Sequence, residues 1–241
     1  MTGALTIYED PEELANRVAD LLMEWIAQST GKRYNLAISG GSTPNLLFST
    51  LAAKYADSKL WQKTHFWWVD ERMVSPGDPD SNFGKAQQLL FSKITIPEKN
   101  IHRILGENDP VMEAEDYAQQ IKAELNMKDG LPSFHLILLG MGEDGHTASI
   151  FPDQMELLLS DHLCVVAYHP VSFQKRITLT GKAINNAQKI FFLVTGANKA
   201  ERLCEILMKG EKGKLLPASH IQPVNGELFW YTDESAAQQL K

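Results

Sequence analysis

Short apolar runs alternate along this chain with longer segments whose apolar residues recur at helical spacing. The apolar runs, rich in β-branched and aromatic residues, predict strands over 34–39, 65–69, 134–140, 163–168 and 190–195. The amphipathic segments predict helices over 11–28, 44–53, 82–91, 110–126 and 198–209. A last apolar run, 228–231, predicts a late strand, which we place at an edge of the sheet.

Two of these runs indicate how the strands are covered. The sequences FHLILLG (134–140) and IFFLVTG (190–196) are almost entirely apolar, as is typical of parallel strands with helices on both faces. The order of elements predicts an α/β fold: a single-domain, doubly wound, mostly parallel sheet of the Rossmann-like kind, with ligands at the carboxyl ends of its strands. We expect one domain over 1–241, because the Pro/Gly/Asp-rich piece 75–81 is too short to separate two and suits a loop beside the site.

Composition narrows the class of protein. Of the 241 residues, 44% are hydrophobic and 22% charged, and the formal net charge of −7 argues against a general nucleic-acid or anionic-membrane surface. The first residues lack the basic and apolar regions of a secretory signal, and no apolar run approaches the roughly 18 residues of a membrane helix. Cys164 and Cys204 lie in apolar contexts without CxxC spacing, so we expect buried free thiols and a cytoplasmic protein.

A glycine-hydroxyl turn separates the first buried strand from the helix after it. The turn runs from Ser39 to Pro44, and helix N-termini attract anions because their first N–H groups are unpaired. Gly40 and Gly41 permit positive φ and close approach of a ligand, while Ser42 and Thr43 add hydroxyls, either of which could cap the helix. The turn therefore predicts a phosphate site, with a merely well-capped helix as the alternative. It is neither a Walker loop nor a GxGxxG fingerprint.

Three consecutive charged residues end the next strand. Asp70, Glu71 and Arg72 cannot all be buried in a core, so at least one faces a cleft or solvent. Arg72 could hold a phosphate or carboxylate through a bidentate contact, although an Asp–Arg pair at the surface would also explain the pattern. Ser81 and Asn82 are expected to cap the following helix.

The third strand leads into a glycine-rich loop that carries a histidine. An unperturbed histidine titrates near pH ~6.5, which makes His146 a natural general base at the open end of an α/β sheet. Asp144, two residues earlier, is close enough to orient the imidazole. Other histidines lack such a setting and are expected to be structural: His65, His102, His135, His162 and His220.

Two later segments supply cations. Lys175 and Arg176 begin an alternating strand, and Lys199 lies in the first turn of the helix over 198–209. A lysine in a first turn opposes the helix dipole unless it meets an anion, so we interpret Lys199 as functional, against the alternative of a solvated lysine.

Five motifs together resemble the 6-phosphogluconolactonase family. They are SGGSTP (39–44), VDERMVSPGDPDSN (69–82), GMGEDGHTASIFP (140–152), RITLTGKAIN (176–185) and VTGANKA (194–200), and they span nearly the whole chain. The resemblance implies a fold like that of glucosamine-6-phosphate deaminases. It also implies hydrolysis of 6-phospho-D-glucono-1,5-lactone to 6-phosphogluconate in the pentose phosphate pathway, with no metal or organic cofactor. We expect this sugar-phosphate lactone as the small-molecule partner, no nucleic acid or membrane, and a monomer or small homo-oligomer.

With that substrate, roles can be assigned as hypotheses. A phosphate clamp would comprise Gly40, Gly41, Ser42, Thr43, Arg176 and Lys199, with Arg72 on the phosphate or on sugar hydroxyls. His146 would be the base, Asp144 its partner, and Asp70 a cleft carboxylate of open role. The first alternative is a deaminase or isomerase, whose DGH loop typically continues into Phe-Asn-Glu; here Thr147 follows. The second is a sugar-phosphate-binding module without catalysis.

Overall fold

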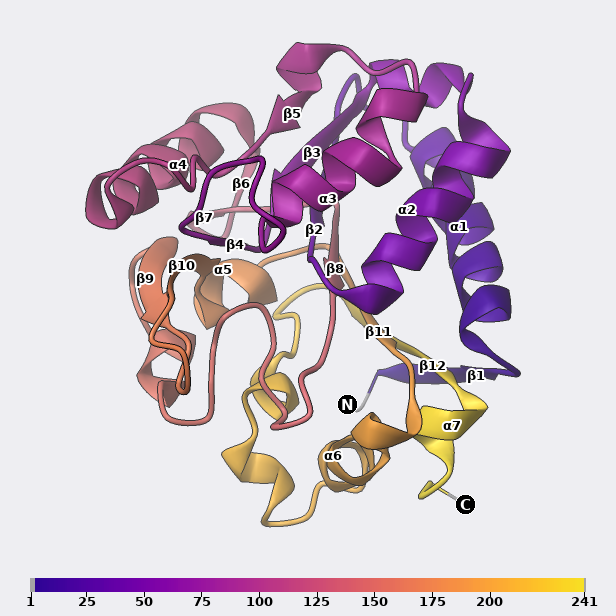
Figure 1. The fold of residues 1–241 in the computed structure, drawn as a ribbon, viewed down its shortest axis with the longest axis vertical. Helices are drawn as coiled ribbons and strands as arrows, with labels where there is room; N and C mark the ends of the chain where they lie inside the picture. Colours follow the sequence, from indigo (N-terminus) through magenta and orange to yellow (C-terminus); the bar gives the residue numbers. More distant parts are fainter. Residues whose placement is uncertain (1–2, 241) are drawn as a thin grey trace.

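The computed structural model describes residues 3–240, and its main sheet has seven parallel strands. Their order is β1-β12-β11-β8-β2-β3-β5. Their bounds are β1 Ala4–Tyr8, β2 Tyr34–Ile38, β3 Thr64–Trp68, β5 Ile101–His102, β8 Leu136–Leu139, β11 Lys189–Val194 and β12 Glu227–Asp233. From β2 the chain proceeds outward to β3 and β5, and from β8 outward in the opposite direction, so the winding reverses between β2 and β8 (Figure 1). The predicted doubly wound α/β sheet is confirmed.

A second, antiparallel sheet adjoins the first. Its order is β4 (Asp70–Arg72), β10 (Lys175–Leu179) and β9 (Cys164–Tyr168), and β6 (Met127–Lys128) pairs with β7 (Leu131–Pro132) in a separate hairpin. The strand predicted over 163–168 exists, and it lies in this second sheet and not in the main one. Its exposed Tyr168 and half-buried Val165 and Val166 show a strand that is not covered by helices on both faces.

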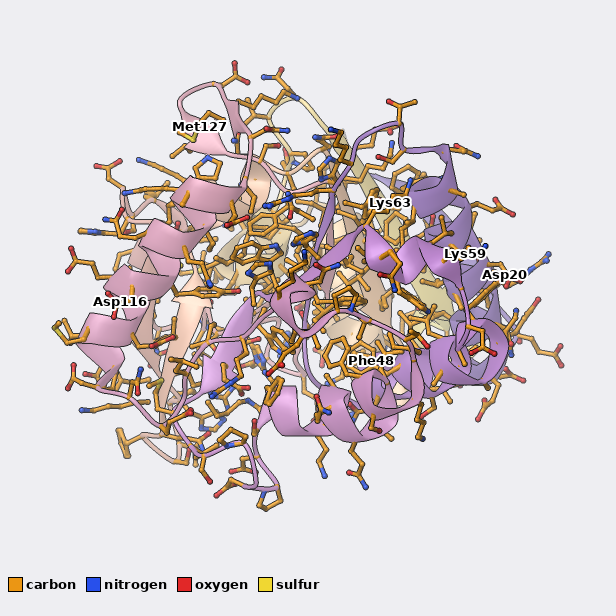
Figure 2. All side chains as sticks on the ribbon, turned by 90° about the horizontal axis from the view of Figure 1, so that it is seen from above. Asp20, Phe48, Lys59, Lys63, Asp116 and Met127 are labelled. Atoms are coloured by element: carbon orange, nitrogen blue, oxygen red, sulfur yellow. The ribbon has the colours of Figure 1, made fainter. Side chains whose placement is uncertain are left out.

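Helices cover both faces of the main sheet. They are α1 Pro11–Gln28, α2 Ser42–Tyr55, α3 Asn82–Leu89, α4 Pro110–Glu124, α5 Gly181–Asn185, α6 Ala200–Leu207 and α7 Glu234–Ala237. Short 3₁₀ helices are η1 Lys59–Gln62, η2 Phe91–Lys93, η3 Glu98–Asn100, η4 Met155–Leu158, η5 Ala197–Lys199, η6 Gly213–Leu215 and η7 Pro217–His220. Seen from above, α1 with Asp20 and α2 with Phe48 lie on one side of the sheet, and α4 with Asp116 lies on the other (Figure 2).

The aromatic residues of β3 show how the core is divided between these faces. Phe66 and Trp68 contact Phe91 on the side of α2 and α3, with ring centroids 5.0 and 5.9 Å apart. Trp67 points the other way, 5.9 Å from the ring of Tyr117 in α4. All three β3 rings are at most 1% exposed, and each contributes roughly 1.5–3 kcal/mol or more by leaving water. This packing fixes β3 and therefore the charged residues that follow it.

Two expectations need correction at the outer strands. β12 is not an edge strand, because β1 pairs beside it with Ala4 opposite Phe229. The sequence pattern missed β1 because Leu5 and Ile7 are 40% and 44% exposed and give no buried run.

The two cysteines agree only in part with the expectation of buried free thiols. Both cysteines are free, but only Cys164 is buried; Cys204 is half-buried and its Sγ lies 3.2 Å from the carbonyl oxygen of Gln239. Burial raises the pKa of the Cys164 thiol. Within residues 3–240, no helix has the length and apolar character needed to cross a bilayer.

Candidate active site

One cavity of about 210 Å³ opens where the winding of the sheet reverses, at the carboxyl ends of β2, β3, β8 and β11. In Figure 1 the long loop after β8 lies on this side of the sheet. The cavity is lined by nine residues singled out in the sequence: Gly40, Gly41, Ser42, Thr43, Asp70, Arg72, His146, Arg176 and Lys199. Loops far apart in the chain therefore converge as the sequence predicted.

The glycine-hydroxyl turn differs in detail from the expectation. α2 begins at Ser42 and its N-cap is Gly41, at φ 114°, with no side-chain cap; capping by Ser42 or Thr43 was wrong. The Thr43 hydroxyl instead lies 2.7 Å from that of Thr195, a cavity residue after β11 that sequence reasoning missed. The first N–H groups of α2 are therefore free of a capping side chain, as an anion site requires.

A close contact with Asn82 requires a glycine at position 40, independently of any ligand. A Cβ at Gly40 would come 1.8 Å from Oδ1 of Asn82, at the start of α3. Asn82 was expected only as part of a helix cap, yet it also lines the cavity and donates to the carbonyl of Asp70 at 3.0 Å. The cap itself is Ser81, which accepts from the N–H of Gly84.

Two guanidinium groups lie side by side in the cavity. β10 pairs with β4 so that Arg176 is opposite Arg72, and both side chains leave the same face of this small sheet. Arg176 is 8% exposed, and the Nε atoms of both arginines are buried without a hydrogen-bond partner within residues 3–240. Burial lowers the pKa of Arg176, but a guanidinium stays charged at neutral pH. Two unpartnered buried donors indicate a site for an anion.

A buried serine joins Asp70 to this pair. Ser149 is 0% exposed, donates to Oδ2 of Asp70 at 2.6 Å and accepts from Arg176 at 3.4 Å. Asp70, 4% exposed, therefore has a neutral hydrogen-bond partner and a nearby cation. No local sequence pattern points to Ser149, because its role depends on β10 packing against the loop after β8.

Glu71 does not line the cavity. It is 1% exposed, faces away from Asp70 and Arg72, and accepts from the N–H groups of Asn82 and Phe83 at 2.8 and 2.7 Å. Burial raises the pKa of Glu71, and these hydrogen bonds oppose the rise. The carboxylate thus occupies the N-terminus of α3 and holds Asn82 at the cavity.

His146 and Asp144 form the contact expected from the sequence. Nδ1 of His146 lies 2.6 Å from Oδ1 of Asp144, which stands behind the imidazole and does not line the cavity. Burial raises the pKa of Asp144, but hydrogen bonds and the charge of His146 outweigh it, so the pKa is lowered. An ionised carboxylate only accepts, so in the neutral imidazole Nδ1 carries the proton and Nε2 keeps its lone pair. The ring of Phe151, 4.7 Å away, packs against the imidazole.

Lys199 lines the cavity, but it precedes the helix instead of lying in its first turn. It ends η5 and is the N-cap of α6, which begins at Ala200. Its side chain is 20% exposed, with Nζ 3.9 Å from Oε1 of Glu143. Burial lowers the pKa of Lys199, against the opposing charges of Glu143 and Asp144.

The remaining histidines lie away from the cavity lining, including the five expected to be structural. His169, not singled out in the sequence, lies near the site, with its ring 5.4 Å from that of Phe151. Within residues 3–240, no group of three or more His, Cys, Asp or Glu side chains is arranged to hold a metal ion.

Comparison with known proteins agrees with this geometry. Residues 9–230 match the family model described as glucosamine-6-phosphate isomerases/6-phosphogluconolactonase. A 6-phosphogluconolactonase of Aggregatibacter actinomycetemcomitans is 48% identical over 207 residues, covering 86% of this chain and 87% of that protein. A crystal structure described as devB protein is 42% identical with a TM-score of 0.94, covering 99% of both chains. A Trypanosoma cruzi 6-phosphogluconolactonase structure is 28% identical with a TM-score of 0.88, covering 99% of this chain and 97% of that one.

Proposed function

The chain belongs to the family of glucosamine-6-phosphate isomerases and 6-phosphogluconolactonases, and from that premise we propose that it hydrolyses 6-phospho-D-glucono-1,5-lactone to 6-phosphogluconate. The observation that carries the proposal is the sharing of one cavity by an imidazole and an anion site. His146 is oriented by Asp144, and the guanidinium groups of Arg72 and Arg176, each with an unpartnered Nε, line the same cavity.

The phosphate of the substrate is remote from the carbonyl that reacts. We assign its clamp to the free N-terminus of α2, with Gly40, Gly41, Ser42 and Thr43, and to the cations of Arg176 and Lys199. Arg72 contacts the phosphate or the sugar hydroxyls. Because a dianion held at one end fixes the ring, the binding energy of the phosphate orients the carbonyl beside His146.

His146 then acts as a general base. Nε2 takes a proton from a water molecule as the water oxygen bonds to C1 of the lactone. Ionised Asp144 holds Nδ1–H and stabilises the imidazolium that forms. When the tetrahedral intermediate breaks its bond from C1 to the ring oxygen, the imidazolium returns the proton to that oxygen. The product is an open-chain carboxylic acid, which ionises at neutral pH.

The negative charge of the intermediate needs donors. Two N–H groups of the glycine-rich loop are already used, because Gly142 donates to the carbonyl of His146 at 2.8 Å and Gly145 donates to that of Gly142 at 3.1 Å. The oxyanion is therefore assigned to donors of the cavity other than these two N–H groups. Asp70, fixed by Ser149, keeps Arg176 in place and is not given a chemical step.

The segment after His146 favours lactone hydrolysis over deamination. Thr147 is 1% exposed and donates to the carbonyl of Gly140 at 2.9 Å, while Ser149 is bound to Asp70. This segment therefore presents hydroxyl groups where ring opening of an amino sugar would use a carboxylate. Neither hydroxyl side chain can serve as a proton donor of carboxylic strength.

A pH-stat assay tests the proposal. Protein added to freshly generated 6-phosphogluconolactone should release acid well above the spontaneous rate, because each turnover yields one carboxylate and one proton. Release of ammonia from glucosamine 6-phosphate, without acid release from the lactone, would instead identify a deaminase. Tight binding of either compound without turnover would identify a binding module.

We also propose a cytoplasmic location and a monomer or small homo-oligomer. The two free cysteines favour a reducing compartment. Fractionation of cells and light scattering on the purified chain test these two points.

A further inference from the structure

A second polar cavity lies at the opposite end of the main sheet, where β2 and β3 begin. Figure 2 looks onto this end, with Lys63, the residue before β3, labelled. The cavity has a volume of about 330 Å³. It is lined by Lys32, Arg33, Gln62, His65, Lys99, Asn100, His102 and Glu124, and it shares no residue with the active-site cavity.

Two buried imidazoles form the inner wall of this amino-end cavity. His65 and His102 are 7% and 8% exposed, and Nδ1 of His65 lies 2.9 Å from Nε2 of His102. The second nitrogen of each ring has no hydrogen-bond partner within residues 3–240, and neither is among the fully buried unpartnered atoms, so both are accessible to solvent. The ring of His102 stacks on Trp67 at 3.9 Å, with 4° between the planes, so the pair is held rigidly. The two neutral histidine rings share one N–H in their mutual contact, so one of the two remaining nitrogens is a donor, and it is open to the cavity for a ligand.

The rim of the cavity is cationic. Arg33 pairs with Glu124, but the ammonium groups of Lys32 and Lys99 form no ion pair within residues 3–240. Three cations against one carboxylate give this cavity a positive charge, although the whole chain carries −7. The side-chain amides of Asn100 and Gln62 donate to backbone carbonyls, so the ammonium and imidazole groups remain as donors.

We propose that this amino-end cavity binds a phosphate group through Lys32, Lys99 and the buried pair of His65 and His102. A dianionic oxygen cluster would satisfy the free imidazole N–H and both ammonium groups at once. The phosphate is either the free ion or the end of a small phosphate monoester, since the cavity exceeds one phosphate in size.

The test is NMR of the histidine side chains in the full chain, titrated at pH 7 with inorganic phosphate and separately with glycerol 3-phosphate. Sodium chloride at matched ionic strength controls for screening. The signals of His65 and His102, assigned with the variants His65→Gln and His102→Gln, should shift and saturate at millimolar ligand. Tighter saturation by glycerol 3-phosphate identifies a monoester as the ligand; equal or weaker saturation identifies free phosphate.

A pair of matched double variants makes the test specific. Lys32→Ala with Lys99→Ala should weaken saturation at His65 and His102 at least tenfold. Lys59→Ala with Lys212→Ala removes two other exposed lysines and should change it less than twofold. The signal of His146 reports the active site independently in every titration. Shifts at the buried pair no larger than those in sodium chloride, or unchanged in the first double variant, would overturn the proposal.

Discussion

The two ends of β2 and β3 hold their charges in different ways. At the carboxyl ends Arg176 and Asp70 are 8% and 4% exposed and are fixed by Ser149 before any substrate arrives. At the amino ends the cations of Lys32 and Lys99 are exposed, whereas the histidines behind them are buried. Charges that are already oriented stabilise a transition state without reorganisation, whereas exposed lysines must be ordered on binding. The difference predicts catalysis at one end and weak binding at the other.

Replacement of the base at the carboxyl end should give the largest effect. General-base catalysis contributes roughly 10²–10⁴-fold, so His146→Ala should lower kcat on the phosphorylated lactone by about that factor, with a modest change in KM. Pre-steady-state and steady-state pH-stat rates measure it. His162→Ala, at an exposed position outside both cavities, is the matched control and should retain full rate. Nearly full activity of His146→Ala would show that His146 is not the general base.

The buried histidines at the amino end should affect the pH dependence of the free energy of unfolding and not the catalytic rate. Burial, first, and then the charge of His65 lower the pKa of His102 to about 4, with Glu124 opposing and Arg33 adding to the shift. The unfolded chain, with its histidines near pH ~6.5, then binds more protons than the folded chain between these values. The free energy of unfolding is therefore complete above pH ~6.5 and falls as the pH drops towards 4. For His102 alone the loss is on the order of 3 kcal/mol.

Urea unfolding from pH 7 to pH 4 checks this sign and size. His102→Gln cannot titrate, so its curve should lose less stability over the same interval than that of the unsubstituted chain. His65, whose pKa burial also lowers, and Arg33, Lys99 and Glu124 all face this pair and remain in the variant. His162→Gln again serves as the exposed control. Parallel curves for the chain and His102→Gln would mean that His102 is not held neutral.

Replacement of Lys199 by alanine tests whether the phosphate of the substrate is bound at the carboxyl end. A hydrogen bond to a charged group is worth about 1.5–3 kcal/mol, so Lys199→Ala should reduce kcat/KM on the phosphorylated lactone by roughly 10- to 100-fold. The rate on unphosphorylated glucono-1,5-lactone should change less than about twofold, because no phosphate is lost from the contact. Lys212→Ala, with a side chain 81% exposed, is the matched control. An equal loss on both lactones would contradict the clamp.

The sequence could predict those features of the fold and site that depend on local patterns. The turn at 39–44 and the loop at 140–147 are local patterns, so their glycines, His146 and Asp144 were visible as motifs. β1 was not visible, since Leu5 and Ile7 are exposed. The separate sheet of β4, β10 and β9 was missed because a strand of similar composition gives no sign of which sheet it joins.

Residues whose roles depend on tertiary packing could not be predicted. Ser149 and Thr195 acquire partners only when loops distant in the chain meet. Glu71 is different, because a signal existed: side chains alternate along a strand, so Asp70 and Arg72 must share a face that Glu71 leaves. The alternation of side chains along a strand therefore predicts that Glu71 points away from the cavity, as the structure shows.

Removal of the exposed cations at the amino end should change the activity least. Lys32→Ala with Lys99→Ala removes the exposed cations of the amino-end cavity. Neither touches the active-site cavity, so kcat and KM on the phosphorylated lactone should stay within about twofold. Exposed substitutions of this kind usually change the free energy of unfolding by no more than about 0.5 kcal/mol. The pH-stat assay and urea unfolding at pH 7 measure both quantities on one preparation.

A larger change would carry a specific meaning. β3 connects the two ends, because only residues 66–69 separate His65 from Asp70, and its rings are packed on both faces. A tenfold fall in kcat in this double variant, with unfolding unchanged, would show that occupancy or charge at the amino ends is transmitted along β3 to Asp70 and Arg72. The two ends would then be one coupled system, and the weak phosphate site would have to be treated as part of catalysis. Rates within twofold keep them separate, because a rigid strand transmits no effect unless it has a second arrangement to adopt.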